Sequence, residues 1–337
     1  MDPAQILLLV LWVGVTCYAL LGGADFGGGI WDLLAGRSRA GMPERNLIEN
    51  SIGPVWEANH VWLIFVLVVL WTGFSPVFAA VMSTLYIPLT LVAFGIIARG
   101  SAFAFRKASP RLWQKRLFGG AFAVSSVLTP FFLGAAAGGV ASGRVPVGLA
   151  AGNIVTGWLN PTSMLGGVLA VGTCAYLAAI YLCDDAVRAG MSHLVESFRT
   201  KALITGLCVG VVALAGIAVL RADAPRLFDG LTHRALPLVI ASAVFGLLSL
   251  VLLWRRNFVL VRITGALAVT AVLWGWPLAQ YPLMLPPSLT LNEAAAHPAV
   301  LTATLISLAV GALLLVPSLA LLFLLQGRWS YRSDASD

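Results

Sequence analysis

Charged residues are scarce in this chain, and that scarcity indicates its class. Only 10% of the 337 residues are Asp, Glu, Lys or Arg, while 59% are hydrophobic. Soluble domains carry roughly 25% charged residues. The mean hydropathy of +0.92 shows the same imbalance. One large soluble core is therefore excluded, and we expect an all-α polytopic membrane protein with a single membrane domain over residues 1–337.

Cysteine and histidine are also few, which limits metal and haem chemistry. The four cysteines form no C-x-x-C pair, so a zinc site or a c-type haem is unsupported, and we interpret them as packing residues. Only His60 lies within an apolar run; His193, His233 and His297 lie in loops or at the ends of runs. Because two haems held by paired histidines need four such ligands inside spans, we expect this chain to hold no haem and no metal by itself.

Long apolar runs are plentiful, and a membrane span needs about 20 mostly apolar residues. Nine runs meet this requirement, at roughly 5–23, 55–73, 76–98, 117–141, 161–183, 202–220, 235–254, 258–279 and 299–325. The second and third are joined by a tight turn at 72–76. Thr16-Cys17-Tyr18 has a weak internal similarity to residues 173–176. This similarity would fit four-helix repeats over 1–141 and 161–279 plus a final helix at 299–325. Chance explains a match of three residues better.

Lysine and arginine predict the orientation of these spans. All but four of the 21 basic residues lie in alternate connections or in the tail, and the other side holds only Arg144, Arg221, Arg226 and Arg234. The positive-inside rule then places the N-terminus outside and the C-terminus in the cytoplasm. The N-terminus lacks a basic region and a cleavage site, so the first run is expected to be retained.

The formal charge of +7 has a simple explanation in this distribution. The basic residues lie between apolar runs and form no patch, which argues against a nucleic-acid partner. We interpret Arg99 and the cluster that continues from Arg106 to Arg116 as cytoplasmic anchors to anionic lipid.

Residues 50–62 contain polar side chains at the start of an apolar run. Glu57 and His60 are three residues apart and share one face of a helix. Ionisable groups within spans often mark proton paths, so this pair is a candidate relay, with Asn59 able to hydrogen-bond between them. The alternative is a helix start, where the macrodipole favours an acid and the histidine lies at the interface.

Asp25 lies among five glycines at the end of the first run. It is a candidate for accepting protons or coordinating an ion. Equally, it would stabilise a strained helix end, because glycine serves left-handed and close-approach positions. Pro88 and Pro130 fall inside expected spans and predict kinks, and the proline-rich stretch 277–287 predicts a rigid external connection.

Three stretches share the pattern of one known family. They are Gly23-Ala24-Asp25-Phe26-Gly27-x-Gly29, the long motif Arg45-x4-Asn50-Ser51-Ile52-Gly53-Pro54-Val55-Trp56-Glu57-Ala58-Asn59-His60-Val61-Trp62-Leu63, and Ala279-Gln280-Tyr281-Pro282 with Leu285-Pro286-Pro287-Ser288. With them, the chain resembles subunit II of the cytochrome bd-type quinol oxidases over essentially its full length. The short external loops are similar to the shorter, cyanide-insensitive branch.

The resemblance implies a subunit of a respiratory terminal oxidase in the bacterial cytoplasmic (inner) membrane. Quinol is oxidised, dioxygen is reduced to water, and proton motive force is generated. Haem b and haem d, or a haem b variant, belong to the partner subunit I. The resemblance further allows small accessory subunits, surrounding lipids, and a structural quinone or lipid on this chain.

The resemblance also implies roles for residues of the long motif. Glu57 takes the place of an acid implicated in a proton path, with His60 and Asp25 as further candidates on that path. Trp62 borders a proposed oxygen channel, and Trp56 and Asn59 are candidates for the same channel or for the subunit interface. No residue is expected to be catalytic in the strict sense.

Two other classes of function remain open at this point. Broken helices and intramembrane acids would also fit a secondary transporter, although the spans contain few charges. A purely structural membrane subunit that only stabilises its partner is the third interpretation.

Overall fold

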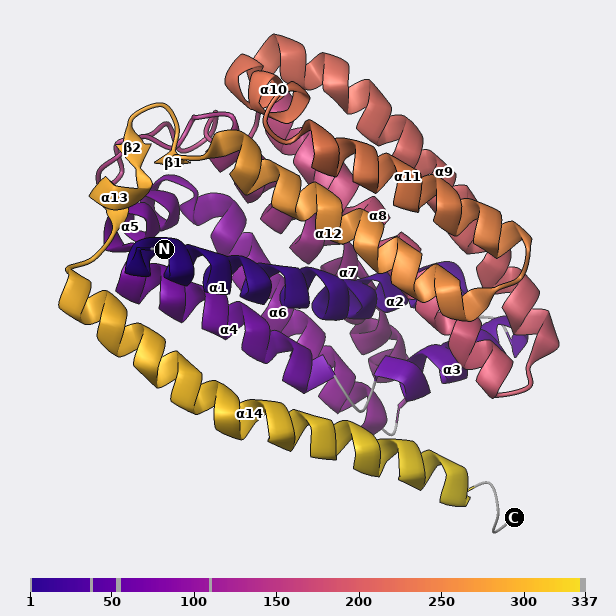
Figure 1. The fold of residues 1–337 in the computed structure, drawn as a ribbon. Coiled ribbons are helices and arrows are strands. Elements are labelled where there is room, and N and C mark those ends of the chain that lie inside the picture. The colour runs from indigo at the N-terminus through magenta and orange to yellow at the C-terminus, as the bar shows by residue number, and fades with distance from the viewer. Residues whose placement is uncertain (1, 37–38, 53–55, 109–110, 334–337) are drawn as a thin grey trace.

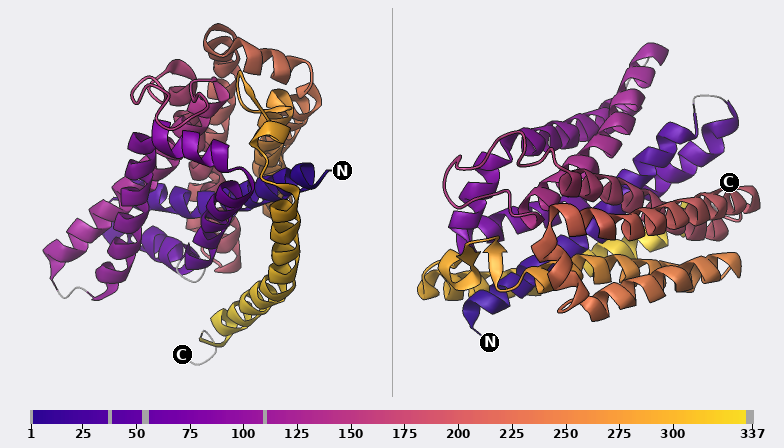
Figure 2. Two further views of the ribbon diagram at one scale, coloured as in Figure 1. Left: turned by 90° about the vertical axis from the view of Figure 1, so that its left-hand side faces the viewer. Right: turned by 90° about the horizontal axis from the view of Figure 1, so that it is seen from above.

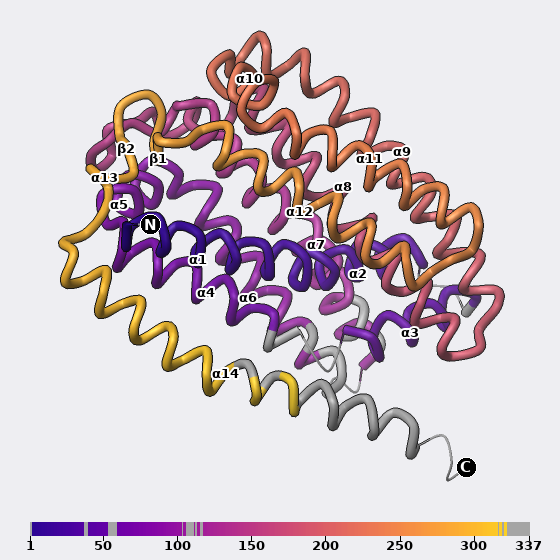
Figure 3. Tube along the Cα trace, in the orientation of Figure 1, coloured from indigo at the N-terminus to yellow at the C-terminus, as the bar shows by residue number. Residues whose placement is uncertain are grey.

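The computed structural model describes residues 2–36, 39–52, 56–108 and 111–333, and these form a bundle of helices (Figure 1). Figure 3 follows the same path as a tube. The side chains of Trp56, Glu57 and Ala58 lie outside the described set.

The long helices are α1 (Pro3–Cys17), α2 (Gly23–Leu34), α4 (Trp56–Gly73), α6 (Tyr86–Ala108), α7 (Leu112–Ala141), α8 (Pro161–Arg188), α9 (Ser192–Asp223), α11 (Leu236–Trp254), α12 (Phe258–Gln280) and α14 (Pro298–Ser333). The shorter elements are η1 (Tyr18–Gly22), η2 (Arg39–Gly41), α3 (Met42–Ile52), α5 (Ser75–Thr84), α10 (Pro225–Thr232), β1 (Leu283–Leu285), β2 (Leu289–Thr290) and α13 (Leu291–Ala294). The two strands pair in antiparallel orientation.

The helices confirm an all-α membrane protein. Within the described ranges, seven helices are long and apolar enough to cross a membrane, counting Pro3–Leu34 as one. The pair formed by 59–73 and α5 is bent by 119° and would make an eighth span if it crosses as one unit. The expected count of nine spans, their orientation and the four-helix repeats stay predictions.

The expected third span, 76–98, is wrong as a single helix. The chain ends α5 at Thr84 and begins α6 at Tyr86, with Leu85 between them in a non-helical conformation. Pro88 therefore lies in the first turn of α6, where a missing N–H costs little, and does not kink a span. The turn expected at 72–76 is present as the bend between α4 and α5.

The first span is longer than expected. It was expected to end near residue 23, but a π-helical turn, η1, leads directly into α2, which continues to Leu34. The glycines of α2 serve close approach and not a left-handed turn. A Cβ at Gly27 would lie well within 3.0 Å of the Cys174 carbonyl on α8, and one at Gly29 would collide with Ser126 on α7.

Helix α2 thus lies inside the bundle, packed against α7 and α8. Helices α6 to α9 are consecutive neighbours, and α11 and α12 pack on each other beside α8 and α9. The last helix, α14, packs against α1 and α4 and runs along one edge of the bundle, apart from α9 and α11 (Figures 1 and 2). Polar side chains from α2, α4, α6 and α7 meet in the interior of this arrangement.

One end of the bundle is held by a charged residue from α9. Lys201 donates to Glu44 on α3, and its ammonium lies over the rings of Trp31 and Phe198 at 5.2 and 4.9 Å. The Trp31 indole N–H donates to the Ala175 carbonyl at 2.8 Å. These contacts attach the end of α2 to α8 and α9, and so fix the helix that carries Asp25.

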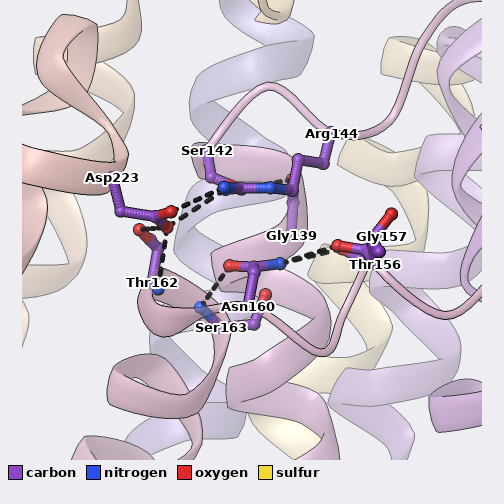
Figure 4. Close-up of polar contacts among 9 residues, drawn as sticks. All are labelled: Gly139, Ser142, Arg144, Thr156, Gly157, Asn160, Thr162, Ser163 and Asp223. Carbon is purple, nitrogen blue, oxygen red and sulfur yellow. Dashed lines mark hydrogen bonds and ion pairs between the residues drawn. The ribbon is translucent and has the colours of Figure 1, made fainter. Parts of the chain in front are cut away.

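The opposite end is held by a second charged cluster (Figure 4). The Asp223 carboxylate, at the end of α9, accepts hydrogen bonds from Arg144 Nη1 at 3.1 Å and Nη2 at 2.6 Å. It also accepts from the Thr162 backbone N–H at 3.0 Å and hydroxyl at 2.6 Å. Asn160 caps α8 by accepting from the Ser163 N–H. Asp223 therefore ties the 142–160 connection and the start of α8 to α9.

Replacing Asp223 with asparagine is expected to lower the free energy of unfolding by about 2 kcal/mol, because hydrogen bonds to a charged group contribute roughly 1.5–3 kcal/mol. The matched control is Asp229→Asn, whose carboxylate is 76% exposed and pairs with His233. Such a pair contributes about 0–1 kcal/mol. Thermal unfolding of the purified protein measures both, and equal shifts for the two variants would contradict the role of Asp223.

The connection after α12 is compact. Gln280 donates to the carbonyls of Leu283 and Met284, and β1 and β2 follow. Thr290 caps α13, and its N–H and hydroxyl donate to the Glu293 carboxylate, which lowers the pKa of that exposed acid. The stretch that the sequence predicted to be rigid is therefore held by local hydrogen bonds.

Candidate functional site

The Asp25 side chain lies in the interior of the bundle. It occupies the first turn of α2 and is only 3% exposed. Asn59 on α4, also buried, donates from Nδ2 to the Asp25 carboxylate at 2.7 Å and to the Leu21 carbonyl at 3.5 Å. The structure therefore brings together two residues that the sequence singled out separately, 34 positions apart.

Arg99 on α6 completes this centre. It is 1% exposed, and its guanidinium donates to the Asp25 carbonyl at 2.7 Å and to the Ser126 hydroxyl at 3.0 Å. The guanidinium carbon lies 4.7 Å from the ring centroids of both Phe26 and Phe122. The prediction that Arg99 anchors lipid headgroups is wrong, because α6 packs against α7 and the Arg99 side chain reaches α2, which buries its charge away from any lipid surface.

We call Asp25, Asn59, Arg99 and Ser126 the Asp25 centre. Its charged and polar groups come from four helices, and Arg99 also interacts electrostatically with the Asp25 carboxylate. A buried charge is tolerated when hydrogen bonds and an opposite charge compensate its desolvation. The centre can therefore hold a charge, and pass or store a proton, in surroundings that are otherwise apolar.

Gly29 and Ser126 explain how the guanidinium is positioned. Because Gly29 has no side chain, the Ser126 hydroxyl comes close to α2. That hydroxyl donates to the Phe122 carbonyl at 2.7 Å and accepts from Arg99. A single glycine on α2 thus allows α7 to supply the acceptor that orients Arg99.

His60 lies one turn into α4, beside the Asp25 centre. It is half-buried, and its ring makes edge contacts with Tyr18 at 6.2 Å and Phe26 at 6.0 Å between centroids. Glu57 is the second residue of the same helix, but its side chain lies outside the described residues. The proposed pairing of Glu57 with His60 therefore stays a prediction.

The two tryptophans of the long motif lie on the same helix. Trp62 is half-buried and makes an edge contact with Phe65 at 6.0 Å between ring centroids. The side chain of Trp56 is outside the described set. The roles of Trp56, Trp62 and Asn59 at an oxygen channel or an interface stay predictions, and Asn59 also belongs to the Asp25 centre.

Arg99 and Ser126 are the residues that the sequence analysis missed. A signal for Arg99 was present, because it follows the apolar stretch 89–98, and a charge inside a span marks a functional site by default. Ser126 gave no such signal. A serine inside an apolar run is common, and only the packing of α7 on α2 shows that it faces an arginine.

The positions of the histidines bear on haem and metal binding. No group of three His, Cys, Asp or Glu residues gathers to hold a metal ion in the part of the chain that the structure describes. His193 begins α9, His233 follows α10, and His297 precedes α14, so these three lie at helix ends and not inside spans. His60 contacts two aromatic rings. The histidines thus do not fit a paired axial ligand set.

Comparisons with known proteins agree on one family. The family model described as "Cytochrome bd terminal oxidase subunit II" matches residues 3–326. The chain is 27% identical to "Cytochrome bd ubiquinol oxidase subunit 2" of Bacillus subtilis over 255 residues, which cover 75% of this chain and 72% of that protein.

Two further comparisons extend this result. The chain is 32% identical to "Cytochrome bd-I ubiquinol oxidase subunit 2" of Escherichia coli over 230 residues, covering 64% of this chain and 58% of that protein. It also superimposes on a chain of the bd oxidase from Geobacillus thermodenitrificans with a TM-score of 0.72 and 22% identity. That match covers 96% of this chain and 98% of the other, and it supports the fold.

Proposed function

The chain belongs to the family of cytochrome bd terminal oxidase subunit II, and from this membership we propose that it is the haem-free second subunit of a quinol oxidase. In such a complex two quinols give four electrons to one dioxygen, and four protons complete two waters. The partner, subunit I, would carry haem b and haem d or a haem b variant. The names of the relatives support quinol as the electron donor.

The single observation that carries a role in proton access is the Asp25 centre. A carboxylate, an amide and a guanidinium are buried together between α2, α4 and α6. Ionisable groups inside a membrane are costly and usually serve a path for ions or protons. In our proposal, protons enter near Glu57 and pass His60 on their way to Asp25.

We further propose how the subunit sits in its membrane. Nine spans with the N-terminus outside would place the start of α4 at the cytoplasmic side of a bacterial inner membrane, where the protons originate. The early spans would form the apolar interface with subunit I, with Trp56 and Trp62 buried there or beside the oxygen route. A structural quinone or lipid and small accessory subunits are compatible with this arrangement.

The alternatives make different predictions for the purified complex. An oxidase subunit co-purifies with a larger chain that gives haem bands in a reduced-minus-oxidised spectrum, and the isolated chain binds no stoichiometric haem. A haem-free homo-oligomer would support a secondary transporter. If every variant of the Asp25 centre turns over normally and only the assembly of the complex is impaired, the result would support a purely structural subunit.

The test of the proton path is Glu57→Gln in the assembled oxidase. We expect slower quinol-driven oxygen uptake and proton uptake, by about 100-fold if the carboxyl is an obligatory acid–base group, with the haem spectrum preserved. Glu57→Asp should retain more activity, because it keeps the carboxyl.

Glu293→Gln is the matched control, since Glu293 is exposed beyond α12 and its carboxylate accepts local hydrogen bonds from Thr290. It should leave oxygen uptake unchanged. If Glu57→Gln turns over normally with full haem content, Glu57 is not an obligatory member of the proton path and acts only as a helix-end acid.

A further inference from the structure

The Tyr18 hydroxyl is buried and has no hydrogen-bond partner among the described residues. Three other buried hydroxyls share this property, those of Thr84, Thr129 and Ser163. These three belong to short side chains on helices, which can turn to a carbonyl three or four residues earlier. A phenol cannot do so, because its rigid ring carries the hydroxyl away from its own backbone. Tyr18 therefore needs a partner from elsewhere.

The position of the Tyr18 ring is fixed by its surroundings. The ring lies over Gly22, where an added Cβ would come within 2.9 Å of it. Its edges contact Phe26 at 6.4 Å and His60 at 6.2 Å between centroids. Tyr18 also begins the π-helical turn η1, which leads directly into the helix of Asp25. Single π-turns occur frequently at functional sites.

The groups near this hydroxyl can hold a water molecule. The Tyr18 ring contacts Phe26, and the Arg99 guanidinium carbon lies 4.7 Å from the centroid of that same ring, on the helix that carries Asp25. A carboxylate offers about four acceptor positions, of which the Asn59 amide fills one, and a guanidinium has five donor N–H groups. A buried water needs two to four such partners. The phenol, the buried carboxylate and the guanidinium together offer this number.

We propose that the Tyr18 hydroxyl binds an internal water shared with the Asp25 centre, and that this phenol–water pair passes protons between the His60 side and Asp25. The water gives one proton to the carboxylate as it takes one from the phenol, and the phenol regains a proton from the donor side. Both groups end unchanged. The proton transfer in this proposal rests on the proton path proposed above, whereas the water site does not.

The experiment compares Tyr18→Phe with Tyr176→Phe in the assembled oxidase. Tyr176 has the same phenol, but its hydroxyl is hydrogen-bonded to Ser249. We expect Tyr18→Phe to slow oxygen uptake about fivefold, the rate equivalent of one hydrogen bond, and to enlarge the solvent deuterium isotope effect. Its haem content and unfolding temperature should stay near those of the parent. Tyr176→Phe should lower the unfolding temperature and leave the rate and isotope effect unchanged.

A high-resolution map of the parent oxidase tests the water directly, by density within hydrogen-bond distance of the Tyr18 oxygen. No density there and an unchanged rate in Tyr18→Phe would overturn the inference, even if Glu57→Gln is slow. A second outcome is also decisive. If the density disappears in Tyr18→Phe but both Tyr18→Phe and Glu57→Gln have normal rates, the water site is supported and the proton transfer is overturned.

Discussion

Replacing Gly27 with alanine is expected to force α2 away from α8 and to disrupt the Asp25 centre. A Cβ at this position would overlap the Cys174 carbonyl and lie 2.6 Å from the Ala178 Cβ, so the main chain of α8 itself must move. Overpacking typically costs about 1–3 kcal/mol, and we expect the upper end, about 3 kcal/mol, because main-chain atoms yield less easily than side chains. The unfolding temperature and the haem content of the purified complex should both fall.

Gly23→Ala is the matched control on the same helix. Its new Cβ would meet only Cys174 Sγ at 3.5 Å and Leu177 Cδ1 at 3.9 Å, which are ordinary contacts. Alanine also favours a helix over glycine by about 1 kcal/mol. Gly23→Ala should therefore be neutral or slightly stabilising. Similar losses in both variants would mean that the glycines serve backbone conformation and not close packing.

The sequence predicted the helices well where an apolar run was long and ended at polar residues. Helices α8, α11 and α12 follow the expected runs, and the bend between α4 and α5 lies at the expected turn. The break at Leu85 could not be predicted. It lies inside an apolar stretch, and periodicity does not distinguish one buried helix from two shorter ones.

Helix α2 shows a second limit of sequence reasoning. Its glycines disfavour a helix by propensity, and the first span was expected to end there. Packing against α8 and α7 reverses this preference, because only glycine permits the approach at Gly27 and Gly29. Tertiary contacts of this kind involve residues more than 90 positions away, which a local pattern does not contain.

The candidate site could be predicted only in part. The sequence identified Asp25 and Asn59 as unusual polar groups, but it assigned them to different roles and placed Arg99 at a lipid surface. Their meeting depends on how α2, α4 and α6 are arranged in space. Charge counting treats each arginine alike, so it cannot separate one that faces lipid headgroups from one that faces a buried carboxylate.

The partnership of Arg99 with Asp25 predicts a specific pattern in a double-mutant cycle. Arg99→Leu removes the donors to the Asp25 carbonyl and to Ser126, and it leaves the Asp25 carboxylate without its nearby cation. Breaking a buried pair in this way costs about 3–5 kcal/mol. Adding Asp25→Asn removes the uncompensated acid, so the double variant should be more stable than the sum of the single losses by about 1–3 kcal/mol.

Unfolding temperature and haem content of the assembled oxidase measure this cycle. Arg255→Leu is the control, because Arg255 is exposed at the end of α11 and its loss should be nearly neutral. Strictly additive losses would contradict an electrostatic partnership and leave Arg99 as a packing residue between Phe26 and Phe122. Turnover is expected to behave differently from stability: the double variant should recover haem but not oxygen uptake, because asparagine cannot accept the proton that the Asp25 carboxylate is proposed to carry.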